Sequence, residues 1–142
     1  MRRRLYLRRS ISIIIGIALA IALVDGAWHL AGRWFPLTAD DFFGGANDIP
    51  SIVTMPLPGM LLIALGWLLA GLAGAFAALR VGQWRPAGWI VTSIIVAMNV
   101  WNIRAVAQPN WLMITALIAP LVGGWLAERH FHRARPGDPL IG

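Results

Sequence analysis

Four long apolar stretches, separated by shorter polar segments, dominate the pattern of this chain; they cover residues 10–30, 57–79, 87–107 and 111–127. The first would form about 31 Å of helix at about 1.5 Å per residue, which matches the thickness of a bilayer's hydrocarbon core. Every backbone polar group in lipid must be paired within its own segment, so stretches this long and apolar predict transmembrane helices. The fourth stretch is shorter, and its helix could extend to Phe131 because Glu128 can reach the headgroups.

The connections predict how these helices are arranged. Residues 80–85 join the second stretch to the third, and residues 108–110 join the third to the fourth. Links this short make neighbouring helices antiparallel. We therefore expect an all-α membrane protein, a four-transmembrane-helix up-down bundle that forms a single membrane domain. The remaining segments are expected to be an outer loop over 31–56 and tails over 1–9 and 128–142.

The composition supports a membrane protein. Hydrophobic residues make up 58% of the chain and charged residues 13%, and the mean hydropathy is +0.69. A soluble domain carries about a quarter charged residues, so these values argue against a water-soluble fold. The chain has no cysteine, which excludes a disulfide scaffold, a thiol nucleophile and a cysteine-ligated metal site.

The basic residues predict the orientation. All are arginines, and all but Arg33 and Arg104 lie on one side of the expected membrane. The others are Arg2, Arg3, Arg4, Arg8, Arg9, Arg80, Arg85, Arg129, Arg133 and Arg135. The positive-inside rule then predicts that both termini are cytoplasmic, in a multi-pass protein of the bacterial inner (plasma) membrane. The arginines suit anionic lipid headgroups as partners, and nucleic acid is not expected to be one.

The N-terminus has a competing interpretation. A basic segment followed by an apolar run is also typical of a cleaved signal peptide. The run over 10–30 is long, and no clean small-x-small site precedes a polar mature start. We therefore expect an uncleaved first span.

Small residues predict how the helices pack. Without a hydrophobic driving force, helices in lipid associate where small side chains let their backbones approach. In the second span these residues fall within roughly 100° of arc at about 100° per residue, which predicts a helix-packing groove. They are Gly59, Gly66, Ala70, Ala73, Gly74 and Ala77. A groove for a lipid tail or a partner helix is the alternative.

Ionisable and amide side chains within the spans form the candidate site. Asp25 and His29 lie one helical turn apart in the first span, and Asn99 and Asn102 share one face of the third, followed by Arg104. Both spans run outward, so these five residues could converge in the outer half of the bundle. Charged groups at such positions mark functional sites by default. The cluster would be either a structural network or a site for a proton, a cation or a headgroup.

The chemistry of these residues does not favour an enzyme. Asp25 and His29 could act as an acid–base pair, but no nucleophile accompanies them. The H-E-x-x-H motif is absent, and two ligand-type residues do not complete a zinc site. We therefore expect no metal and no cofactor, with haem ligation by His29 left open.

The outer loop could form an ordered cap. Thr38 and Asp41 have the spacing of a capping box, which predicts a short helix through Phe42 and Phe43 that ends at the glycines over 44–45. Such a helix could lie in the headgroup layer as a lid over the polar cluster. The alternative, a divalent-cation site, would use Asp40, Asp41, Asn47 and Asp48.

Three segments carry a resemblance: residues 24–29, residues 57–74, and Asn102 followed by residues 108–111. They resemble a widespread, functionally uncharacterised family of small four-span bacterial inner-membrane proteins. A histidine often precedes the last proline in that pattern. Gln108 stands there in this chain, which weakens any shared metal or proton site. The resemblance implies the four-span topology and no particular activity.

Two functions remain. The favoured one is an integral inner-membrane protein without catalytic activity, acting as an accessory or assembly subunit of a larger membrane complex. The alternative is a small homo-oligomeric transporter, flippase or channel that uses the polar cluster, with Asp25 as the coupling residue. In either case the expected partners are the lipid bilayer and other subunits.

Overall fold

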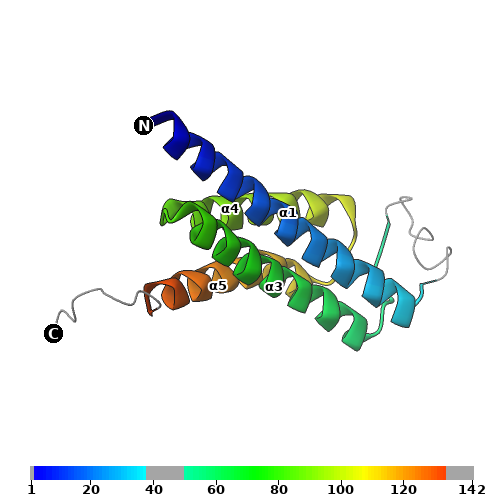
Figure 1. Ribbon diagram of the computed structural model, residues 1–142. Helices are drawn as coiled ribbons and strands as arrows, with labels where there is room; N and C mark the ends of the chain where they lie inside the picture. The colour runs from blue at the N-terminus through cyan, green and yellow to red at the C-terminus, as the bar shows by residue number, and fades with distance from the viewer. Residues whose placement is uncertain (1, 38–49, 134–142) are drawn as a thin grey trace.

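The computed structural model describes residues 2–37 and 50–133, and all of the regular structure in them is helical (Figure 1). Each helix contains an apolar window long enough to cross a membrane, which confirms the expected all-α fold with four potential membrane spans. The helices are α1 (Arg2–Trp34), α3 (Leu57–Gly82), α4 (Pro86–Ala105) and α5 (Asn110–Arg133).

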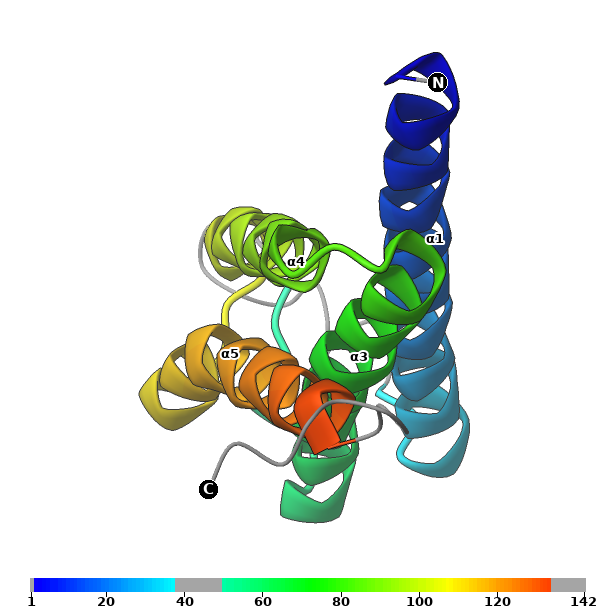
Figure 2. The ribbon, with the colours of Figure 1, turned by 60° about the vertical axis from the view of Figure 1, so that its left-hand side comes forward.

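Helix α3 is the centre of the molecule. It packs against α1, α4 and α5, whereas α1 and α5 lie on opposite sides of it and do not touch over the described residues (Figure 2). Successive helices run in opposite directions, so α1 begins at the end of the bundle where α5 finishes (Figure 1). The connectivity is therefore up-down, but the helices surround α3 instead of forming a square.

Glycines explain how closely α1 approaches α3. A Cβ atom added to Gly74 would lie 2.8 Å from the carbonyl oxygen of Gly16, and one added to Gly16 would lie 2.6 Å from the carbonyl oxygen of Gly74. Further along the same crossing, Gly66 leaves room for Ala27. Small residues on both helices thus bring the two backbones into direct contact, as is typical of packing in lipid.

A second glycine pair brings α5 against another face of α3. A Cβ atom on Gly71 would lie 2.7 Å from Cα of Pro120, and one on Gly123 would lie 2.6 Å from the backbone nitrogen of Leu72. Helix α3 can occupy the centre because it presents small residues to helices on two sides.

Several helix boundaries differ from the expected ones. Helix α1 includes the arginine-rich segment expected as a tail, because arginine is a good helix former and the segment has no helix breaker. It ends at Trp34, since Pro36 disfavours helical geometry in the residue before it. Helix α4 ends at Ala105 because Val106 is extended, with φ −131° and ψ 124°. The short helix and the cation site expected in the outer loop lie outside the described residues.

Residues 50–52, at the end of the outer loop, pack into one end of the bundle. The Ala107 N–H donates to the Pro50 carbonyl at 2.7 Å, and the Ile52 N–H donates to the Ala107 carbonyl at 3.0 Å. These bonds hold the fully buried Ile52 side chain in a core cluster with Trp67 and Leu112. The described part of the loop, from Pro50 onward, is thus an integral part of the core.

Arginines and tryptophans contact each other at the opposite end. Arg8 donates from Nε to the Val81 carbonyl at 2.8 Å, and the Arg9 guanidinium lies 4.9 Å from the centre of the Trp84 ring. Glu128 accepts a hydrogen bond of 2.8 Å from Trp89 Nε1, which ties α5 to α4. Such a mixture of cationic and aromatic side chains is typical of a membrane–water interface.

Candidate functional site

Three of the five residues of the expected polar cluster, Asp25, Asn99 and Asn102, line one cavity between α1 and α4, and His29 and Arg104 do not line it. Asp25 and His29 lie on the face of α1 opposite the bundle, with side chains that are 71% and 80% exposed. On α4, Asn99 is buried, Asn102 is half-buried and Arg104 is exposed. The two amides thus face inward from α4, whereas the carboxylate, the imidazole and the guanidinium are exposed.

The pair on α1 makes its contacts within its own helix. His29 Nδ1 donates to the Asp25 backbone carbonyl at 3.1 Å and lies 3.7 Å from Asp25 Oδ1. Ala18 and Ala22 are exposed on the same side of the helix, one and two turns earlier. These four residues, Ala18, Ala22, Asp25 and His29, are called the outer face of α1 below. This face lies within an apolar span and is not covered by another helix in the described chain.

Asn99 connects two helices. Its Nδ2 donates to the carbonyl oxygen of Ala116 on α5 at 2.6 Å. In a regular helix that carbonyl would accept from the N–H of residue 120, but Pro120 has no N–H to donate. Asn99 therefore satisfies a backbone acceptor that a proline leaves open inside the membrane span.

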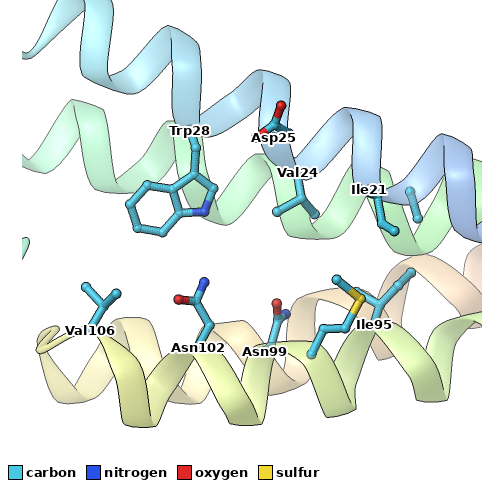
Figure 3. A pocket seen from close by; sticks show the side chains of 10 residues that line it. Ile21, Val24, Asp25, Trp28, Ile95, Asn99, Asn102 and Val106 are labelled. Atoms are coloured by element: carbon cyan, nitrogen blue, oxygen red, sulfur yellow. The ribbon is translucent and has the colours of Figure 1, made fainter. Parts of the chain in front are cut away.

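A cavity of about 400 Å³ lies between α1 and α4 (Figure 3). The Trp28 ring extends into it from α1 toward α4, and the side chains of Asn99 and Asn102 point into it from α4 (Figure 3). The Asp25 carboxylate is on the rim and turns away from α4 (Figure 3). The rest of the lining is apolar: Ala20, Ile21, Val24, Ile95, Met98 and Val106.

The cavity also includes residues that the sequence pattern does not single out. Neither Trp28 nor Met98 is among the residues that the sequence predicts for a site. Trp28 and Asn102 lie near the corresponding ends of the first and third spans, which is the one indication in the sequence that they could meet. Whether the two side chains face each other depends on how α1 and α4 are rotated about their axes, which their nearly uniform apolar composition does not specify.

The expected helix-packing groove faces α1 along most of its length. Gly74 abuts Gly16, Gly66 abuts Ala27, and Ala70 is buried in a cluster that includes Ala20. A Cβ atom on Gly59 would instead meet side-chain atoms of Met55 and Phe35. The groove is thus filled largely by the first helix of the same chain. A cavity of about 200 Å³ with an apolar lining remains beside it, between α1 and α3.

Metal-binding side chains do not gather in the described residues, which contain no group of three or more histidine, aspartate or glutamate side chains placed to hold an ion. One buried polar group in the core is unpaired: the Trp67 indole N–H, in a side chain that is 1% exposed. It lies beside Ile52 and Ala116 within the core cluster and does not line either cavity.

The fold and the cavity thus define the class of the molecule, an all-α protein with four potential membrane spans and an amide-lined cavity between two of them. The chain matches no protein-family model, no curated protein and no solved structure. The family resemblance of its motifs therefore stays a prediction.

Proposed function

We propose that this chain is a non-catalytic subunit of a larger membrane assembly and that the outer face of α1 is where its partner binds. The observation that carries the proposal is the position of Asp25 and His29, exposed on an apolar span and turned away from the bundle. Ionisable groups are costly in contact with lipid and are found facing protein or water. A partner helix on this face would remove them from lipid.

The shape of the outer face also suits a transmembrane helix. Ala18 and Ala22 are small and exposed, so a second backbone can come close to α1 beside the charged pair. The Asp25 carboxylate can accept hydrogen bonds only, since an ionised carboxylate has no proton to give. The partner is accordingly expected to present a hydrogen-bond donor or a cation next to Asp25.

The second candidate is a homo-oligomer that acts as a small transporter, flippase or channel. Its specific support is Arg104, which is exposed in the last turn of α4, while Asp25 lies in the C-terminal third of α1. The outer face of α1 in one copy could then meet the Arg104 side of the next copy. Contacts between two different faces of this kind generate a ring when the rotation from one copy to the next closes.

Native mass spectrometry of tagged protein, extracted gently from its own membrane, separates the two candidates. A complex with stoichiometric foreign subunits supports the accessory role, and a discrete homo-oligomer supports the alternative. Ala22→Trp should break either complex because the indole prevents close approach at the outer face. Ile118→Trp is the control, since it places the same indole at an exposed position on α5. A wild-type chain that is monomeric in its native membrane would refute both.

We further propose that both termini are cytoplasmic in a bacterial inner membrane. The support is that Arg8 and Arg9 near the start of α1, Arg80 and Arg85 between α3 and α4, and Arg129 near the end of α5 belong to one end of the bundle, where Arg8 contacts Val81 and Arg9 contacts Trp84. Such an excess of arginine marks the cytoplasmic side and suits anionic headgroups. A reporter that is active only outside the cytoplasm should be inactive when fused to the C-terminus and active when inserted between residues 38 and 49. The reverse pattern would refute this orientation.

A further inference from the structure

The cavity between α1 and α4 contains hydrogen-bonding groups that have no partner. Within the residues that the structure describes, neither the Asn102 carboxamide nor the Trp28 indole N–H makes a hydrogen bond, although both side chains face the cavity (Figure 3). Asn99 is different, because its amide nitrogen is already used by the Ala116 carbonyl. Asn102 and Trp28 together offer N–H donors and one amide acceptor. Left unpaired in hydrocarbon, such groups are costly.

The apolar lining limits what can satisfy them. Water needs two to four polar partners and a polar site, whereas most of this cavity is lined by aliphatic side chains and a methionine. Ile21 and Met98 line the cavity and are also exposed, at 44% and 47%, on the sides of α1 and α4. Because these side chains lie on membrane spans, the cavity opens sideways toward the bilayer.

The polar side chains of the cavity lie between Val106 at one end and an apolar stretch that faces the middle of the helices (Figure 3). Trp28 and Asn102 lie toward the C-terminal ends of α1 and α4, and Ile21 and Ile95 lie toward the middle of the helices (Figure 3). A lipid has the same order, with its glycerol and ester groups near the membrane surface and its acyl chain deeper. A volume of about 400 Å³ is within the range of small-ligand pockets.

We propose that this cavity binds one membrane lipid from the leaflet at the C-terminal ends of α1 and α4. The acyl chain lies against Ile21, Ile95 and Met98, and an ester or hydroxyl group hydrogen-bonds to Asn102 and Trp28. This site goes beyond the proposed subunit role and does not depend on the outer face of α1. The recognised chemistry is a hydrogen-bonding group attached to an acyl chain, which a two-chain phospholipid or a single-chain lipid could supply.

The test uses the full chain in nanodiscs of phosphatidylethanolamine and phosphatidylglycerol, released into mild detergent for native mass spectrometry. One lipid should stay bound per chain, and its mass distinguishes a two-chain lipid from a single-chain lipid carried through purification. Met98→Trp fills the cavity and Asn102→Leu removes the hydrogen bonds. Each should lower lipid retention by about tenfold. Ala97→Trp and Ser93→Leu are the matched controls, made at exposed positions of α4 that do not line the cavity, and should retain lipid like the wild type.

A photoactivatable acyl chain gives a second readout that does not depend on retention in detergent. In the wild type its crosslinks should concentrate on the cavity side of α1 and α4, and Met98→Trp should abolish that concentration. The proposal is overturned if the wild type retains no lipid, if Met98→Trp and Ala97→Trp retain it equally, or if crosslinks are spread evenly over all four helices. Circular dichroism of each variant checks that the helices remain folded.

Discussion

Asn99 on α4 and Ala116 on α5 are joined by a side-chain-to-backbone hydrogen bond of 2.6 Å, and this bond repairs the gap that Pro120 makes in α5. A proline inside a membrane helix is tolerated when a neighbouring helix satisfies the carbonyl one turn before it. The two residues therefore belong to one structural unit, and the buried amide of Asn99 is explained without a ligand. This pairing gives the first prediction.

Replacing Asn99 should destabilise the chain chiefly because of Pro120. Asn99→Leu leaves the Ala116 carbonyl unpaired, and we expect a loss of about 1–3 kcal/mol in the free energy of unfolding. In a Pro120→Ala background the backbone N–H of residue 120 supplies that bond, so Asn99→Leu should cost less there. A double-mutant cycle, measured by unfolding in mixed micelles, tests this coupling. Additive effects of the two substitutions would contradict the repair.

The crossing of α1 and α3 gives the second prediction. Gly74→Ala places a methyl group 2.8 Å from the Gly16 carbonyl oxygen, where only a shift of the backbone can relieve the contact. We expect a loss of about 1–3 kcal/mol, as for other overpacked sites. Gly26→Ala is the control, since a Cβ atom there meets nothing within 4 Å. It should be neutral or stabilising by up to about 1 kcal/mol, because alanine favours helix over glycine. Equal thermal stability of the two variants would refute the tight crossing.

The loop between α3 and α4 gives a stabilising prediction. Gln83 caps α3 in the left-handed conformation, with φ 48° and ψ 36°, while its N–H donates to the Leu79 carbonyl at 2.9 Å. Glycine adopts this conformation without the steric cost of a Cβ atom, so Gln83→Gly should stabilise the fold by about 1 kcal/mol. Gln83→Ala keeps the Cβ atom and should give no such gain. Melting temperatures in one detergent distinguish these outcomes.

The buried end of the outer loop gives the fourth prediction. Ile52 is fully buried whereas its neighbour Val53 is 55% exposed, so the same truncation should have very different effects at the two positions. Ile52→Ala should cost about 2–5 kcal/mol, because it opens a cavity in the core. Val53→Ala should change stability by less than about 0.5 kcal/mol. If the two variants have the same free energy of unfolding, Ile52 is not part of the core.

The sequence predicts the spans well because their signal is local. Length and hydropathy alone indicate four spanning helices, and short links dictate that α3, α4 and α5 alternate in direction. The rotation of each helix depends on its partners. Helix α1 carries one row of small residues that includes Gly16 and Ala20 and another that includes Ala18 and Ala22, and only the first faces α3. Nothing local distinguishes the two rows, so the sequence could not show that Asp25 faces outward.

The central position of α3 could not be predicted for a similar reason. Gly71 and Gly123 are each unremarkable within an apolar stretch, and their importance comes from meeting across two helices. Likewise, the polar residues of α4 were expected to join Asp25 at a common depth. Depth follows from the position along each span, but which side chains meet at that depth follows from packing.

The separation of α1 from α5 has a consequence for the cavity between α1 and α4. Helices α3, α4 and α5 all contact one another, and α4 is bonded to α5 through Asn99. Helix α1 rests on this unit mainly through its crossing with α3, at Gly16 and Gly74. One wall of the cavity belongs to α1 and the other to α4, and the contacts of α1 with α3, from Gly16 at Gly74 to Ala27 at Gly66, hold the first wall in place. The width of the cavity thus depends on how α1 packs against α3, and not only on the residues that line it.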